Sequence, residues 1–235
     1  MTEELFRDNA YVKSCDATVL FVDEAGIELD RTIFYYESGG QPGDIGTLAA
    51  IDGRTIQITD TRMDRSSGRH LHVPAIGAPT LAPGDKVTAT IDWKRRHRLM
   101  RMHTLLHLIC ATVDADITGC QIGLEKSRID LNTRGKPDKD VIQAKLDELI
   151  AKDLPTAAQW ITEKELAAQP ELVKTMSVSP PTGIGEVRLI AVGGIDLQPC
   201  GGTHVASIGE IGRVRIGKIE NKGKQNRRIN VHLED

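Results

Sequence analysis

The chain has 235 residues, of which 40% are hydrophobic, 27% are charged and only 3% are aromatic. This length and composition fit a globular protein with one large domain or two small ones, built around a core of aliphatic side chains. The formal net charge of −3 excludes a global attraction to phosphate, so any nucleic-acid binding must depend on local clusters of lysine and arginine.

The first residues and the cysteines point to a cytoplasmic protein. No apolar run approaches the length that crosses a bilayer, and the first residues lack the basic-then-apolar pattern of a signal peptide. Cys15, Cys110, Cys120 and Cys200 are spread too widely, in too long a chain, for a disulfide framework. We therefore expect reduced thiols or a thiolate metal ligand, no membrane contact and no obligatory protein partner.

The first part of the chain is predicted to form a small β-barrel or a tightly curled sheet. Short β-rich runs recur there, separated by Gly, Pro and Asp-Gly turns. The sequence pattern changes from β-rich runs to helical spacing of apolar residues at Trp93. We therefore place a β-barrel-like domain over residues 1–93 and a second domain over residues 94–235. The β-rich runs are ATVLFVD (17–23), RTIFYY (31–36), RTIQITD (54–60) and DKVTATIDW (85–93).

The second domain is predicted to be α+β. Apolar residues recur at spacings of three and four over residues 94–113, as on a helix with one buried face. A second such stripe covers residues 140–152, after Pro137 and Asp138 as a start signal. A short helix is expected around residues 163–168. Strand-like runs cover residues 157–162, 186–192, 213–220 and 227–233.

Two short motifs predict a metal centre in the second domain. In HTLLH, His103 and His107 lie four residues apart, so both imidazoles project from one helix face and can reach a common ion. In DLQPCGGTH, Cys200 and His204 have the same spacing, across two glycines that allow a tight backbone path. A soft set of nitrogen and sulfur donors favours tetrahedral Zn²⁺, with one ion per chain.

The chemistry of this centre depends on how many of the four residues stay bound. Four protein ligands close a tetrahedral zinc, as in structural sites, whereas a catalytic zinc keeps one position open. We favour His103, His107 and Cys200 over His204 as permanent ligands. A metalloprotease helix would carry Glu directly after its first histidine, but Thr104 stands there, so the protease interpretation fails.

Three separated segments, SGGQPGDIG, HTLLHL and DLQPCGGTH, resemble the editing domain of alanyl-tRNA synthetase and its free-standing AlaX-type relatives in both motif and order. The resemblance covers nearly the whole chain. It implies a small β-barrel domain followed by an α+β zinc-binding editing domain of the alanyl/threonyl-tRNA synthetase type. The implied zinc ligands are His103, His107, Cys200 and His204, and Gln41 belongs to a glycine-rich loop that borders the pocket.

The implied activity is hydrolysis of the ester that joins a wrong amino acid, chiefly serine and also glycine, to alanine-accepting tRNA. The chain is too short for the synthetase's adenylate-forming core, so we expect a zinc-dependent aminoacyl-tRNA hydrolase that edits mischarged tRNA(Ala) in trans. Gln41 and Thr104 are the candidate catalytic residues, because their polar groups suit a water molecule or the extra hydroxyl of serine.

Three alternative functions stay open at this point. The related threonyl-tRNA synthetase editing domain shares the HxxxH and CxxxH layout, so Ser-tRNA(Thr) is a second possible substrate, although SGGQPGDIG favours alanine. An alternative from a different class of function is a non-catalytic RNA-binding module in which zinc only stabilises the fold. The third is a generic metal-dependent esterase that is indifferent to RNA.

Two basic clusters are candidate tRNA contacts on either side of the zinc pocket. One lies in WKRRHRLMR at the start of the second domain, and the other lies in NKGKQNRR near the end of the chain. Taken alone, either cluster also fits ordinary solvated surface. The candidate tRNA-binding residues are Arg95, Arg96, Arg98, Lys222, Lys224, Arg227 and Arg228.

Overall fold

The structure, a computed structural model, describes residues 2–113, 115–133, 135–176 and 185–234. The chain divides into two units, residues 1–97 and 98–235. The division falls inside a continuous helix, α1 (Trp93–Thr112), whereas the sequence prediction placed it after residue 93. The change from a β-rich to a helical sequence pattern at Trp93 therefore marks where the helix begins. Among the described residues, no helix is both long enough and apolar enough to cross a membrane.

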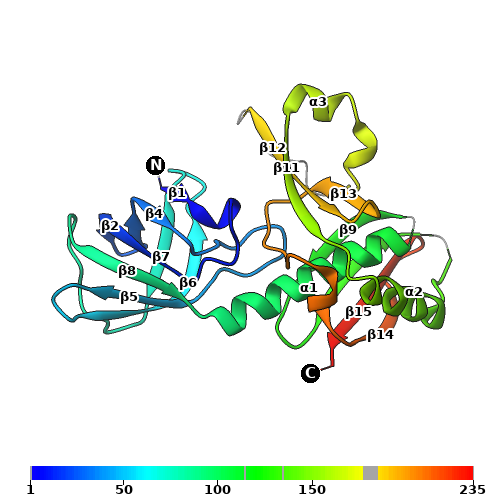
Figure 1. The fold of residues 1–235 in the computed structure, drawn as a ribbon, viewed down its shortest axis with the longest axis horizontal. Coiled ribbons are helices and arrows are strands. Elements are labelled where there is room, and N and C mark those ends of the chain that lie inside the picture. Colours follow the sequence, from blue (N-terminus) through cyan, green and yellow to red (C-terminus); the bar gives the residue numbers. More distant parts are fainter. Residues whose placement is uncertain (1, 114, 134, 177–184, 235) are drawn as a thin grey trace. The chain divides into compact units, whose positions relative to one another are not determined.

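The first unit contains a closed β-barrel with the strand order β2-β3-β7-β6-β5-β8, which confirms the predicted barrel (Figure 1). Exposed and buried residues alternate along β8, so Val87, Ala89 and Ile91 point into an aliphatic core. The barrel strands are β2 (Ser14–Asp23), β3 (Gly26–Leu29), β5 (Gly46–Ala50), β6 (Thr55–Met63), β7 (His70–Pro74) and β8 (Lys86–Ile91).

The run RTIFYY is only partly a strand. Its first two residues form β4 (Arg31–Thr32), which pairs in parallel with β1 (Glu3–Glu4) ahead of the short 3-10 helix η1 (Leu5–Arg7). Ile33 and Phe34 lie beyond the strand but are completely buried. The apolar character of this run therefore reflects core packing and not a continuous ladder of backbone hydrogen bonds.

Two glycines of SGGQPGDIG, Gly43 and Gly46, are required by close approach of the backbone. A Cβ at Gly43 would lie 2.2 Å from the carbonyl oxygen of Thr61, and one at Gly46 would lie 2.1 Å from that of Thr90. Only a residue without a side chain fits these positions. Gly46 is also the first residue of β5, a strand that the sequence analysis did not predict.

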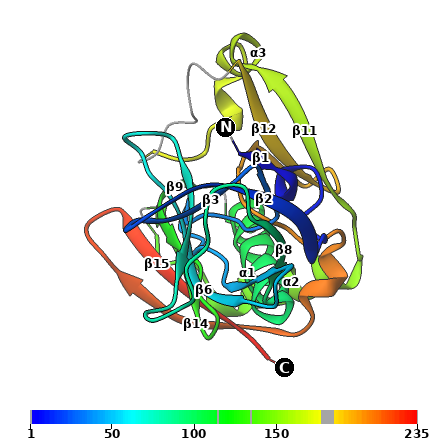
Figure 2. The ribbon, with the colours of Figure 1, turned by 90° about the vertical axis from the view of Figure 1, so that its left-hand side faces the viewer.

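The second unit combines helices with antiparallel sheets, as predicted for an α+β domain. One sheet has the strand order β14-β15-β10-β9 and another has the order β11-β12-β13. Figure 2 shows β14 and β15 as the orange and red pair that ends the chain, and both views place α3 at the far end of β11 and β12. The strands are β9 (Asp116–Gln121), β10 (Ser127–Asn132), β11 (Thr156–Thr162), β12 (Glu186–Val192), β13 (Asp196–Pro199), β14 (Val214–Asn221) and β15 (Asn226–Leu233).

Two α-helices of the second unit begin at side-chain caps. The helix α2 (Lys139–Ala151) starts after Asp138, whose carboxylate accepts hydrogen bonds from two backbone N–H groups of the first turn. The short helix α3 (Glu163–Ala167) starts with a capping box formed by Thr162 and Glu165. The 3-10 helices η2 (Pro170–Leu172) and η3 (Ile208–Ile211) complete the unit.

The helix α1 is more buried than its sequence predicts. Every residue from Met102 to Cys110 is buried, so the expectation of one buried face is wrong for this stretch. The apolar residues pack into the core, as expected for a helix without a solvated face. Three polar residues, His103, Thr104 and His107, share this burial and therefore need polar partners inside the protein.

Candidate metal centre

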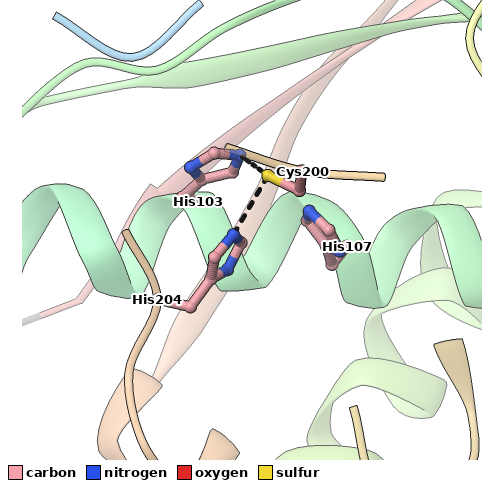
Figure 3. A group of neighbouring side chains, drawn as sticks. All are labelled: His103, His107, Cys200 and His204. Carbon is pink, nitrogen blue, oxygen red and sulfur yellow. Dashed lines mark hydrogen bonds between the residues drawn. The ribbon is translucent and has the colours of Figure 1, made fainter. Parts of the chain in front are cut away.

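The four residues predicted as zinc ligands lie together in the second unit (Figure 3). His103 and His107 come from neighbouring turns of α1, Cys200 directly follows β13, and His204 lies in the loop beyond it. One donor atom from each residue lies within 4.8 Å of the donors of the other three. The fold therefore joins the two sequence motifs into one cluster of three imidazoles and one thiol.

Two of the distances from Cys200 fit a tetrahedral metal ion. Its Sγ lies 3.5 Å from Nε2 of His103 and 3.3 Å from Nε2 of His204. Donors at zinc–ligand distances of about 2.0–2.3 Å lie roughly 3.3–3.8 Å from one another in a tetrahedron. His204 is no farther from the sulfur than His103, so the structure does not support setting His204 apart from the other ligands.

Electrostatics favour the metal-binding protonation states of Cys200 and His204. Burial raises the pKa of the Cys200 thiol, but His103 and His204 outweigh this effect and hold the pKa well below its usual value. Burial lowers the pKa of His204 to about 3, and the neighbouring His103 contributes to this shift. A thiolate and a neutral imidazole are the forms in which these side chains act as ligands. Burial lowers the pKa of His107, but the hydrogen bond with Asp196 outweighs it and raises the pKa to about 9, so a metal ion must displace a proton from this ring.

Thr104, predicted as a catalytic residue, contacts His204. The Thr104 hydroxyl oxygen lies 3.1 Å from Nδ1 of His204 and accepts a hydrogen bond of 3.3 Å from the backbone N–H of Val205. Thr104 is completely buried. Because its hydroxyl engages Nδ1, the other ring nitrogen of His204 is the one that faces Cys200.

A buried carboxylate that the sequence analysis missed contacts His107. Asp196 Oδ2 lies 2.9 Å from His107 Nδ1 and accepts a hydrogen bond of 2.8 Å from the Gln198 side-chain amide. Its Oδ1 lies 2.8 Å from Lys174 Nζ. Burial alone would raise the pKa of Asp196, but the hydrogen bond with His107 leads the effects that lower it to about 2.

Strand alternation is a signal in the sequence that could have indicated Asp196 and Gln198, but the sequence analysis did not use it. In DLQPC, positions 196, 198 and 200 lie on one face of an extended strand, so the ligand Cys200 shares that face with Asp196 and Gln198. The contact of Lys174 with Asp196 joins segments that are 22 residues apart, and no local pattern indicates it.

Gln41 lies in the first unit, in a tight turn. Its backbone exchanges hydrogen bonds of 2.9 and 3.1 Å with Ser38, and its side chain is completely buried. Gly39 and Gly40 between them have positive φ values of 56° and 81°, which glycine adopts without strain. This turn is the glycine-rich loop of the sequence analysis, and the assignment of Gln41 to the pocket stays a prediction.

Arg96 was predicted to face tRNA phosphates, and this prediction is wrong. The side chain is completely buried. Its guanidinium forms an ion pair with the Asp44 carboxylate and donates to the carbonyl oxygens of Ala10 and Ile33 at 3.0 and 2.7 Å. Arg96 is therefore a core residue of the first unit, and Asp44 of the SGGQPGDIG segment is its partner.

The remaining basic candidates differ in exposure. Arg227 is buried and donates to the backbone oxygen of Gly223 at 3.0 Å, so it too is removed from the set that faces solvent. Arg228 is half-buried and paired with Asp130 at 2.7 Å. Arg95 and Arg98 are half-buried, whereas Lys222 and Lys224 are exposed on the turn between β14 and β15.

Two family models match the chain. The model described as "Threonyl and Alanyl tRNA synthetase second additional domain" matches residues 187–230, a stretch that includes Cys200 and His204. The model described as "tRNA synthetases class II (A)" matches residues 4–95. Most of the first unit and the last part of the second unit thus match models of domains found in tRNA synthetases.

Relatives match over the whole length. A Methanosarcina barkeri protein named "Alanyl-tRNA editing protein AlaX-M" is 38% identical over 243 residues, with both chains fully covered. A protein of the same name from Saccharolobus solfataricus is 34% identical over 234 residues, covering 97% of this chain and 98% of that one. An "Alanine--tRNA ligase" of Pyrobaculum neutrophilum is 32% identical over 234 residues, which are 93% of this chain but 25% of the ligase.

These matches define a protein built from domains that also occur in class II synthetases for alanine and threonine. The chain belongs to the AlaX family of alanyl-tRNA editing proteins. The resemblance carried by the three motif segments is thereby confirmed.

Proposed function

We propose that this protein hydrolyses the ester of Ser-tRNA(Ala), and also that of Gly-tRNA(Ala), with one Zn²⁺ per chain held by His103, His107, Cys200 and His204. The observation that carries the proposal is the convergence of four donor atoms within 4.8 Å of one another in a member of the AlaX family. Imidazole nitrogens and a thiolate are the ligands that zinc takes most often in proteins.

The residues around the donors prepare the site for this chemistry. Zn²⁺ bound there supplies Lewis-acid polarisation for attack of water on an ester. Thr104 holds the ring of His204, and the lowered thiol pKa keeps Cys200 ionised. Thr104 and the three histidines are buried and Cys200 is partly buried, so little water is present to screen charge and the electrostatic interactions among them are strengthened.

We assign to Thr104 the recognition of the serine hydroxyl. When Nε2 of His204 faces the donors, its Nδ1 carries the ring proton and donates to the Thr104 hydroxyl oxygen, as does the N–H of Val205. Both lone pairs of that oxygen are then in use, and its own proton is left to donate to substrate. Alanine lacks the hydroxyl that would accept this proton, so the site would reject it.

Gln41 is proposed as a second polar group of the active site. Its amide donates and accepts hydrogen bonds without titrating, so it can orient water or substrate at any pH at which the protein is folded. Its support is its place in the glycine-rich turn of the SGGQPGDIG motif.

A panel of charged tRNAs tests the proposed substrate. We expect the protein to release serine from Ser-tRNA(Ala) at least ~100-fold faster than alanine from Ala-tRNA(Ala), with glycine between them, because the hydroxyl is recognised by hydrogen bonding. Equal or faster release from Ser-tRNA(Thr) would transfer the assignment to the threonine system. Equal hydrolysis of serine methyl ester would indicate a generic esterase, and no hydrolysis at all would leave only an RNA-binding module.

We further propose that basic residues contact tRNA phosphates: the exposed Lys222 and Lys224 first, and the half-buried Arg95, Arg98 and Arg228 in addition. Such contacts release counterions, so the logarithm of affinity falls with the logarithm of salt concentration by roughly 0.7–0.9 per phosphate neutralised. Changing Lys222 and Lys224 together to alanine should flatten this slope by about 1.5 and leave zinc content unchanged. Binding isotherms over a salt series measure the slope.

Lys145 and Lys152 provide the matched control for this measurement. Both are exposed lysines of α2 that pair with Glu148 at 2.9 and 2.7 Å, closer than the 3.5 Å at which Lys222 pairs with Glu220. Changing them to alanine removes the same number of lysines and should leave the slope as it is in the unaltered protein. Identical slopes for all three proteins would show that Lys222 and Lys224 are only solvated surface charges.

A further inference from the structure

The carboxylate of Asp196 has more hydrogen-bond donors around it than a surface residue would hold. Asp196 is 4% exposed and lies on β13, four residues before Cys200. Three donors converge on its two oxygens: His107 and Gln198 on Oδ2, at 2.9 and 2.8 Å, and Lys174 on Oδ1 at 2.8 Å. One of these donors, His107, is a proposed metal ligand, whereas Asp196 lies outside the cluster of four donor atoms.

The contact with Asp196 determines which nitrogen of His107 carries the ring proton. An ionised carboxylate only accepts hydrogen bonds, so Nδ1 of His107 must be the protonated nitrogen. In the neutral ring, which is the form that binds a metal, the lone pair then lies on Nε2. The Gln198 amide comes within 3.1 Å of His107 Nδ1 because both N–H groups point at the same carboxylate oxygen.

We propose that Asp196 is a positioning residue that fixes the tautomer and ring orientation of His107 for metal binding, and that Lys174 and Gln198 hold its carboxylate in place. This inference rests on the metal centre of the proposed function. A ligand histidine that donates its second N–H to a carboxylate is oriented and made more basic by that bond. Here the bond is buried, and water does not compete for it.

Lys174 is itself held by the fold. Its backbone oxygen accepts a hydrogen bond of 2.7 Å from Ile117 of β9, and the next residue, Thr175, forms a parallel bridge with Ile117. The Lys174 side chain is 31% exposed and reaches the buried carboxylate from this anchored segment. Its positive charge offsets the cost of burying the charge of Asp196. The contact thus links the 174–175 segment through β13 to α1.

Zinc affinity of variants at Asp196 tests the inference. In Asp196→Asn, one amide oxygen must serve three donors, so at least one of them loses its partner, and Asp196→Ala removes all the contacts. We expect either change to weaken zinc binding about 10–100-fold, measured by competition with a chelator. Asp130→Asn is the matched control, because Asp130 is a buried carboxylate of the same unit that binds Arg128 and Arg228 instead. It should leave the affinity unchanged.

A spectroscopic measurement separates positioning from a general loss of stability. Long-range ¹H–¹⁵N spectra of the zinc-loaded protein report which nitrogen of each histidine is protonated and which is ligated. We expect His107 of the unaltered protein to show a protonated Nδ1 and a ligated Nε2, and expect this pattern to be lost or mixed in Asp196→Asn. Lys174→Met, at a half-exposed position, serves as a second variant if the Asp196 variants do not fold, and should weaken zinc binding about tenfold.

The outcomes distinguish this inference from the proposed function. Tight zinc binding by the unaltered protein, with unchanged affinity and unchanged His107 spectra in Asp196→Asn, Asp196→Ala and Lys174→Met, would overturn the positioning role and leave the metal centre intact. Absence of zinc binding by the unaltered protein would overturn both. Weaker binding and an altered His107 pattern, with Asp130→Asn unaffected, are the results that support it.

Discussion

Replacing Cys200 by alanine is expected to abolish zinc binding and to slow release of serine from Ser-tRNA(Ala) about 1,000-fold. The Cys200 sulfur lies 3.5 and 3.3 Å from the nearest nitrogens of His103 and His204, so its removal takes away the only negative donor of the cluster. A catalytic metal contributes several kcal/mol to transition-state stabilisation, which corresponds to a loss of this size. Elemental analysis of purified protein and a single-turnover assay measure the two effects.

Two further variants control for the Cys200 result. Cys15→Ala removes a half-buried thiol of the first unit that has no part in the cluster, and should keep both zinc and activity. Gln41→Ala should keep one zinc per chain and the fold but react more slowly. A Cys200→Ala protein that still holds one zinc per chain and works at full rate would refute the metal assignment, and unchanged turnover in Gln41→Ala would remove Gln41 from the active site.

Replacing Arg96 by methionine is expected to lower the free energy of unfolding by about 3–5 kcal/mol, because it leaves the buried Asp44 carboxylate without its counter-ion. Arg96 and Asp44 are 0% and 1% exposed, respectively. The change also removes the donors to the carbonyl oxygens of Ala10 and Ile33, of which Ile33 is completely buried. Denaturant unfolding followed by circular dichroism measures the loss.

The control for Arg96 is an exposed arginine of the same unit. Arg62 is paired with Asp60 at 2.6 Å, but its side chain is 63% exposed. Water and salt screen such a pair, so Arg62→Met should leave the unfolding curve nearly unchanged. Similar curves for the two variants would show that the Arg96–Asp44 pair does not stabilise the unit.

Arg96 also shows where charge composition misleads. The run WKRRHRLMR was interpreted as a basic surface because five cations occur within nine residues. Its helical spacing carries the opposite signal, since Arg96 precedes the buried Leu99 and His103 by three and seven residues and therefore shares their face. A buried arginine was predictable in outline, but its partner Asp44 was not, because the contact spans 52 residues.

Some parts of the metal site could be predicted from the sequence and others could not. Helical spacing places His103 and His107 on one face, and the short CGGTH turn keeps Cys200 near His204, so each pair follows from local geometry. The meeting of the two pairs depends on tertiary packing across about a hundred residues, and it was inferred from the matching ligand chemistry of the two motifs and from the resemblance to the editing domain. Asp196 and Lys174 were missed because a buried carboxylate and a half-exposed lysine look like ordinary surface residues in a sequence.

In the first unit, alternation predicted the barrel but not all of its strands. β8 has a clear period of two, whereas β5 begins in a glycine-rich segment that favours a turn interpretation. Glycine is required at position 46 of that strand, because a Cβ there would lie 2.1 Å from the carbonyl oxygen of Thr90 in β8. Such an approach is a property of the closed barrel and leaves no periodic signal in the sequence.

The most direct test of the account is the release of serine from Ser-tRNA(Ala) by the protein as purified, after complete removal of metal, and after return of one equivalent of Zn²⁺ per chain. The account predicts rapid release, loss of release and restoration, in that order, with the fold checked by circular dichroism at each stage. Folded, metal-free protein that releases serine at the original rate would contradict it.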